Sequence, residues 1–311
     1  MTNVSMQQRP RHETGALVQE GPVLLATKPF NGCDAPLAVA RWVATREERA
    51  LHVVSVLEPT EGVVAGAPPP PSRYYADERS ALAAQIRSEI AVGETRPDSL
   101  RVDVLEGPSA QTVVDAARAC GARVIVVGTG RHDPIGRYVY GERALQILSR
   151  ADRPVLIVPR DVVATPPTVA VVAVDFSPAS VRAAHAVLPL LAPGGRLIVV
   201  HVKTGVTLKE ETAGWWNDAY ERRCADLFAQ FIRQLPQIPD VTFESKFLRG
   251  DIVPRIVDYA AAQGAGLIAC GRLGHSLVER VFVGSVSSSL VRHAACPVLV
   301  APELPGDVAW H

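Results

Sequence analysis

Glycines and serines near residue 280 have the types and the spacing of a site for an anion. Residues 270–274 read Cys-Gly-Arg-Leu-Gly after the apolar run 266–269, and residues 284–289 read Gly-Ser-Val-Ser-Ser-Ser. The pattern predicts a buried strand that ends at a glycine, then a loop, then a helix that begins at a second glycine. Glycine lets the backbone approach an anion closely, and the N–H groups of a helix N-terminus point toward it. A serine N-cap that needs no ligand is the alternative interpretation.

The spacing of these glycines is more specific than a lone glycine pattern. Gly271, Gly274, Gly284 and Ser285 form the pattern Gly-x2-Gly-x9-Gly-Ser, which resembles the nucleotide-binding signature of the universal stress protein family. Residues 284–300 also resemble the closing helix and strand of that family. The resemblance implies a small α/β domain whose members bind ATP or do without it. It makes ATP, with or without Mg2+, the expected cofactor.

The resemblance also implies which other residues lie near the nucleotide. In nucleotide-binding members an aspartate after the first strand contacts the adenosine, and Asp175 matches that position. Val202 matches a position whose backbone meets the adenine edge. Arg272 lies in the loop, where its side chain can approach the phosphates, and a solvated side chain is the alternative. A turn or helix-cap aspartate is the alternative for Asp175. The candidate nucleotide-binding residues are Ala173, Asp175, Val202, Cys270, Gly271, Arg272, Gly274, Gly284, Ser285, Val286 and Ser287.

The chain repeats itself once. The residues that repeat are Gly107, Gly128, Gly141 and Pro154, which recur 143 positions later as Gly250, Gly271, Gly284 and Pro297. Upstream the register loosens, and His52 is matched with His201. Two copies of one domain account for the length. We predict copy one at 21–160 and copy two at 168–304, joined by the linker 161–167 and flanked by the tails 1–20 and 305–311.

Apolar runs alternate with helical patterns in both copies. The runs are continuous stretches of Val, Ile and Leu, which is typical of a parallel sheet covered on both faces. The predicted fold is α/β, with two tandem doubly wound domains, each a five-stranded parallel sheet with helices on both faces. The last strands, 155–158 and 298–301, are expected to pair within the chain as an intramolecular pseudo-dimer, which removes two exposed sheet edges. Ligands of such sheets bind at the carboxyl ends of the strands, here at Asp175 and Gly271.

Copy one departs from the signature where copy two keeps it. Thr27 is matched with Asp175, Arg131 replaces Gly274, and Glu142 replaces Ser285. A carboxylate at a helix N-terminus suits the helix dipole but repels a phosphate, at a cost of roughly 1 kcal/mol even in a water-like dielectric. We therefore expect copy one to have lost the nucleotide and to serve as a structural partner.

Composition bears on the compartment and on the partners. The chain has 32 Lys plus Arg against 32 Asp plus Glu, a balance without the basic field that nucleic acid or a membrane surface would need. Five scattered cysteines without a Cys-x-x-Cys pair indicate reduced thiols. No apolar run approaches the ~20 residues of a membrane helix, and residues 1–20 lack the apolar core of a signal peptide. We expect a cytoplasmic protein with neither nucleic-acid nor membrane partners.

Three functions are compatible with these observations. The first is an ATP-binding stress-response regulator, with the nucleotide in copy two. The second is a slow ATPase, although the chain has no Gly-x4-Gly-Lys-[Ser/Thr] loop. Asp251 and Glu279 are the nearest acidic candidates for Mg2+, and a surface or helix-cap role is the favoured interpretation of both. The third is an interaction scaffold without a ligand. Whether two chains form a homodimer, and which protein is the partner, stays open.

Overall fold

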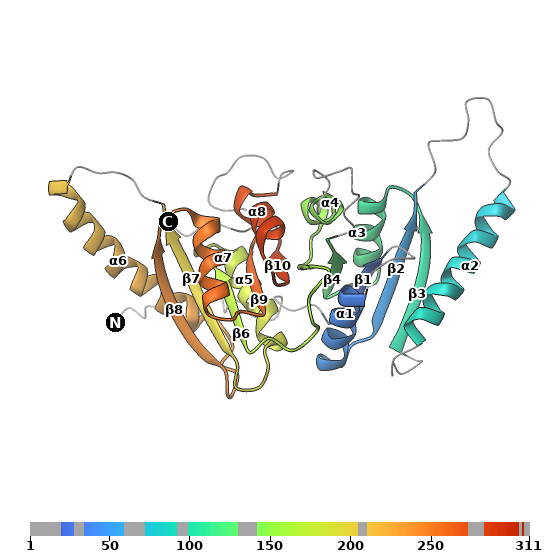
Figure 1. The fold of residues 1–311 in the computed structure, drawn as a ribbon, viewed down its shortest axis with the longest axis horizontal. Helices are drawn as coiled ribbons and strands as arrows, with labels where there is room; N and C mark the ends of the chain where they lie inside the picture. Colours follow the sequence, from blue (N-terminus) through green and yellow to red (C-terminus); the bar gives the residue numbers. More distant parts are fainter. Residues whose placement is uncertain are drawn as a thin grey trace, which may run out of the picture.

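A single twisted sheet runs through the whole molecule. The computed structural model describes residues 20–27, 34–58, 72–91, 99–129, 142–204, 210–272, 283–304 and 307. Ten strands lie in the order β3-β2-β1-β4-β5-β10-β9-β6-β7-β8. The halves lie side by side along the long axis, with α2 and α6 at the outer ends and α4 and α8 near the middle (Figure 1).

Strands and helices alternate in each half, as the apolar patterns predict. Copy one contains β1 (Val23–Thr27), α1 (Asp34–Arg46), β2 (Leu51–Leu57), α2 (Ser72–Ala91), β3 (Leu100–Glu106), α3 (Ser109–Ala119), β4 (Val124–Gly128), α4 (Glu142–Arg150) and β5 (Val155–Val158). Copy two contains β6 (Val169–Ala173), α5 (Pro178–Val187), the 3-10 helix η3 (Leu188–Leu190), β7 (Arg196–Lys203), α6 (Glu210–Arg233), β8 (Thr242–Arg249), α7 (Ile252–Ala262), β9 (Leu267–Gly271), α8 (Ser285–His293) and β10 (Val298–Ala301). Over the described ranges, every helix is too short or too polar to cross a membrane.

The two halves meet through their last strands. β5 and β10 pair antiparallel, with Leu156 opposite Leu299, whereas every other pair of neighbours in the sheet is parallel. The predicted α/β fold is confirmed, and so is the predicted pairing of the last strands. The two five-stranded sheets are therefore halves of one sheet. Because β5 and β10 run in opposite directions, the carboxyl ends of the strands point to opposite edges in the two copies.

Each face of the sheet carries one continuous layer of helices. Buried residues of α1, α2, α5 and α6 form one apolar cluster with the strands, which we call the first helix layer. Buried residues of α3, α4, α7 and α8 form the other cluster, the second helix layer. Both clusters contain residues from both copies. The core therefore crosses the junction instead of stopping at it.

The repeat is visible in the backbone itself. Gly107 and Gly250 have φ values of +139° and +125°, and Gly121 and Gly264 both have +64°. These left-handed conformations favour glycine, because a Cβ atom would be strained there. Both copies therefore have the same two glycine turns. One follows the third strand of the copy, and the other follows the next helix.

Strand register corrects two of the predicted equivalences. Val23 is opposite Val124, and Ala170 is opposite Leu267, the repeat partner of Val124. Val23 therefore corresponds to Ala170.

Counting along β1 and β6 from that pair, Thr27 corresponds to Val174 rather than to Asp175. The position that matches Asp175 is Lys28, which lies outside the described residues. On β2 and β7, Ser55 corresponds to His201, so the predicted match of His52 with His201 is wrong. The register shifts because the connections from β1 to β2 and from β2 to β3 are longer than those from β6 to β7 and from β7 to β8.

Candidate functional site

The candidate site lies at the carboxyl ends of β6, β7 and β9, where the strand order reverses. β6 lies between β7 and β9, and Ala173 is opposite Cys270. Ala173 and Val202 are each 8% exposed, and both belong with Cys270 to the cluster under the second helix layer. Their side chains therefore form an apolar surface on the face of the sheet that the second helix layer covers, next to the carboxyl ends of the strands. The predicted residues Ala173, Val202 and Cys270 are brought together here.

Asp175 follows this apolar surface and is held by the start of α5. The Ser180 hydroxyl donates to Oδ1 of Asp175 at 2.5 Å, and the Ser177 N–H donates to the same oxygen at 3.1 Å. Ser177 is also the N-cap of α5, with Pro178 in the first turn, and both residue types suit these positions. Asp175 therefore has the role of a turn residue, which was the alternative interpretation, and it is still available as a candidate ligand. The serine contacts fix the direction of its carboxylate.

The Cys270 thiol forms part of the wall and is not a nucleophile. Burial, together with the nearby carboxylates of Asp175 and Glu303, raises the pKa of Cys270 to about 12. The thiolate is the nucleophilic form, so a buried thiol with so high a pKa is unreactive at neutral pH. Asp175 follows two residues after Ala173, which is opposite Cys270, so its charge lies close to the end of β9.

The N-terminus of α8 begins directly against the end of β9. Gly284 is the N-cap and supplies no side-chain acceptor to the first turn. Its own N–H donates to the carbonyl of Arg272 at 3.0 Å, which closes the connection from β9 to α8. Ser285 is exposed and Val286 is half-buried. The first N–H groups of a helix have no acceptor within the helix, so this end is suited to an anion.

Two of the predicted phosphate ligands have structural roles instead. The Ser287 side chain is 1% exposed, and its hydroxyl lies 2.7 Å from the carbonyl of Arg272 and 3.1 Å from that of Gly284. Because this hydroxyl is directed to backbone carbonyls, Ser287 fastens the helix end and does not face a ligand.

Arg272 points across the junction into copy one. Its Nη1 donates to the carbonyls of Leu148, Ser149 and Ala151 at 3.3, 3.3 and 3.0 Å, and its Nε donates to Glu303 at 3.2 Å. Arg272 is 9% exposed. The prediction that this side chain approaches phosphates is therefore wrong: the guanidinium binds the C-terminal carbonyls of α4, where a cation suits the helix dipole. Gly274, like Arg131 and Glu279, lies outside the described residues.

The model of the universal stress protein family matches residues 21–159 and 168–302. The chain belongs to the universal stress protein family. A universal stress protein of Mycolicibacterium smegmatis is 27% identical over 212 residues, which is 67% of this chain and 71% of the relative. A putative universal stress protein of Staphylococcus haemolyticus is 48% identical over 58 residues, 18% of this chain and 34% of the relative. The crystal structure of a universal stress protein from Archaeoglobus fulgidus has a TM-score of 0.64 at 18% identity and covers 93% of this chain and 99% of its own.

Copy one of this tandem universal stress protein has charges at the corresponding place. Glu142 is the first residue of α4 and is exposed. The next residue, Arg143, forms an ion pair of 2.9 Å with Glu58, which follows β2. The matching positions in copy two are Val286 and Thr204, neither of them charged. The ion pair therefore joins the end of β2 to the N-terminus of α4, and copy two cannot form it because Thr204 and Val286 are uncharged. The sequence analysis did not predict this pair. The opposite charges of Glu58 after a strand and Arg143 at the start of a helix could have indicated it.

His201 supports the end of β6 from the opposite face of the sheet. Its Nδ1 lies 2.7 Å from the carbonyl of Val174, and its Nε2 lies 2.9 Å from the Tyr220 hydroxyl. A carbonyl only accepts, so Nδ1 carries the hydrogen. Phe176 has a left-handed φ of +63°, and its ring lies 5.0 Å from the His201 ring under α6. This turn sends Phe176 into the first helix layer. Such strain in a bulky residue is found where surrounding packing enforces it.

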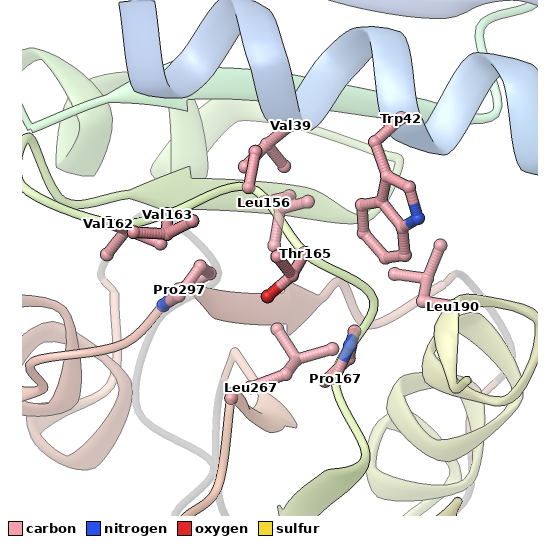
Figure 2. Close-up of a pocket in the computed structure, with 12 residues that line it drawn as sticks. Val39, Trp42, Leu156, Val162, Val163, Thr165, Pro167, Leu190, Leu267 and Pro297 are labelled. Carbon is pink, nitrogen blue, oxygen red and sulfur yellow. The ribbon is translucent and has the colours of Figure 1, made fainter. Parts of the chain in front are cut away.

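An apolar hollow lies elsewhere, at the junction of the two copies (Figure 2). Val39 and Trp42 of α1 face the linker residue Pro167, with Leu190 and Leu267 on the side of copy two. Leu267 is the first residue of β9, so the hollow lies at the opposite end of that strand from Gly271. It is separate from the candidate site.

Proposed function

We propose that copy two binds one adenine nucleotide, and that the chain acts as an ATP-binding stress-response regulator in the cytoplasm with copy one as its structural partner. The observation that carries the proposal is the N-terminus of α8, whose N-cap Gly284 offers no side-chain acceptor to the first turn. The first-turn N–H groups are suited to the phosphates. Asp175, with its carboxylate oriented by Ser180, accepts hydrogen bonds from the adenosine, and the backbone of Val202 meets the adenine edge.

Within the described ranges, no three His, Cys, Asp or Glu side chains gather in a way that could hold a metal ion. Mg2+, where it is bound, would be brought with the phosphates of ATP, as is usual for this hard cation. The family relationship and the loss of the signature in copy one both favour a regulator. A slow ATPase is the second candidate, and release of inorganic phosphate from ATP distinguishes it.

The nucleotide content of the purified protein tests the proposal directly. The protein is denatured, and the released small molecules are identified by chromatography and mass spectrometry. We expect about one adenine nucleotide per chain, from copy two. Two per chain would contradict a silent copy one. None, together with no binding of added ATP, would favour the scaffold.

Ser285→Glu separates nucleotide binding from folding. The change copies Glu142 of copy one to the matching exposed position of copy two. A carboxylate stabilises a helix N-terminus by about 0.3–1 kcal/mol, so the melting temperature should stay the same or rise. The same charge repels phosphate and should weaken ATP binding at least about tenfold. Ser285→Ala is the matched control and should bind within about twofold of the parent. Equal binding by the Glu variant would place the phosphates elsewhere.

A further inference from the structure

Arg272 connects the proposed anion-binding helix end to the other copy. Its carbonyl accepts the Gly284 N–H at 3.0 Å and the Ser287 hydroxyl at 2.7 Å. Both donors belong to the start of α8, so the backbone of Arg272 sets where the first turn of α8 lies. Gly284 and Ser287 thus share this carbonyl as an acceptor.

The side chain of the same residue is anchored in copy one. Its guanidinium donates to three carbonyls at the end of α4, those of Leu148, Ser149 and Ala151, and it also contacts Glu303. The planar guanidinium presents several donors in fixed directions, which suits a cluster of carbonyls better than a single ammonium does. At the repeat position in copy one stands Thr129, whose side chain is too short to make such a contact.

We propose that Arg272 is a positioning residue that braces the nucleotide site of copy two against α4 of copy one. Copy one thereby supports the shape of a site to which it donates no ligand. A binding site needs its groups held within about 0.5 Å, and the first turn of α8 is held through the carbonyl of Arg272. The inference rests on the proposed function for its ligand. The bracing itself is independent of that function.

A second arginine provides a matched control. Arg46 at the end of α1 donates from Nε to the carbonyl of Pro189 at 2.8 Å and from Nη2 to the carbonyl of Leu191. It thus joins copy one to copy two by the same kind of contact. Its partners lie in η3 and directly after it, in the first helix layer, and none of them belongs to the connection from β9 to α8.

Hydrogen exchange of the full-length chain without nucleotide tests the brace. Arg272→Thr, which copies Thr129, should speed exchange of the amides of 284–288 severalfold relative to the parent. Arg46→Thr should leave these amides unchanged although it also removes contacts across the junction. Arg272→Lys, which keeps the charge, should give an intermediate rate and covers the case in which the threonine variant does not fold. Unchanged exchange at 284–288 in folded Arg272→Thr or Arg272→Lys would overturn the inference.

Titration with ATP measures the consequence for the site. We expect the affinity of Arg272→Thr to fall about tenfold and that of Arg46→Thr to stay within twofold. By linkage, ATP should slow exchange at the end of α4 in the parent but not in Arg272→Thr. Parental affinity in folded Arg272→Thr would overturn the inference. A parent chain that binds no ATP would instead contradict the proposed function, and the exchange at 284–288 would still decide whether the brace exists.

Discussion

Asp175 in the candidate site has two roles, in the turn before α5 and in the proposed binding of the nucleotide, and a change of its side chain can separate them. Asp175 completes the turn before α5 through one carboxylate oxygen, which accepts from Ser180 and Ser177. An uncharged side chain of the same shape can accept the same hydrogen bonds. The negative charge is therefore not needed for the turn, whereas a carboxylate is the stronger acceptor for ribose hydroxyls.

Asp175→Asn exploits this difference. The amide oxygen keeps the turn, so the free energy of unfolding should fall by about 1 kcal/mol or less. ATP affinity should fall about tenfold, because a charged acceptor is replaced by a neutral one. Calorimetry for binding and urea unfolding for stability give the two numbers. Asp175→Ala, which loses both roles, should lower both. If Asn and Ala variants both bind ATP like the parent, Asp175 is only a turn residue.

Helices of the first layer are fastened to each other by buried polar contacts. His185 on α5 is 9% exposed, and its Nε2 lies 3.1 Å from the carbonyl of Gln234, just after α6. Burial lowers the pKa of His185 below its usual value, although the contact with the Gln234 carbonyl partly opposes this. The neutral imidazole is therefore part of the packed state of these two helices.

Stability should decrease as the pH falls below the usual histidine pKa of about 6.5. The folded pKa is lowered, so the unfolded chain takes up the proton first, and the stabilisation present above pH 6.5 is lost as the pH falls through the folded value. One such group contributes at most about 1.4 kcal/mol per pH unit. Urea unfolding at pH 7.5 and 5.0 should show a smaller loss in His185→Gln than in the parent. Equal losses would assign the pH dependence to other groups.

At the scale of the whole molecule, the two copies form one structure. The sheet is continuous through β5 and β10, both helix layers cross the junction, and Arg46 and Arg272 each connect the copies. A unit with shared core and shared polar contacts is expected to unfold cooperatively.

We expect the parent chain to unfold in a single transition. Circular dichroism and tryptophan fluorescence should give the same midpoint in urea, because the four tryptophans include Trp42 at the junction and helices lie in both copies. The double variant Arg46→Thr with Arg272→Thr should lower the midpoint and separate the two curves. Two transitions in the parent would contradict a shared core, and coincident curves in the double variant would show that the sheet alone couples the copies.

The sequence by itself determined the α/β fold, the repeat and the place of the glycine signature. These features depend on periodicity and spacing along the chain, as in the apolar runs that became β6 and β9 and in the recurrence of Gly107 as Gly250. A serine followed by a proline, as at the N-cap Ser177 of α5, is likewise a local signal, because a cap acts within one turn.

Only the tertiary structure decided which way the polar side chains of the site point. The sequence pattern predicted Arg272 and Ser287 as ligands of the nucleotide. In the structure, Arg272 binds carbonyls more than 120 positions away, and the Ser287 hydroxyl binds the carbonyl of Arg272. The pair of Glu58 and Arg143 likewise joins distant segments, and the match of Thr27 with Val174 depends on strand register. Such contacts arise when the sheet brings remote segments together, and side-chain direction is then set by neighbours that spacing along the chain does not specify.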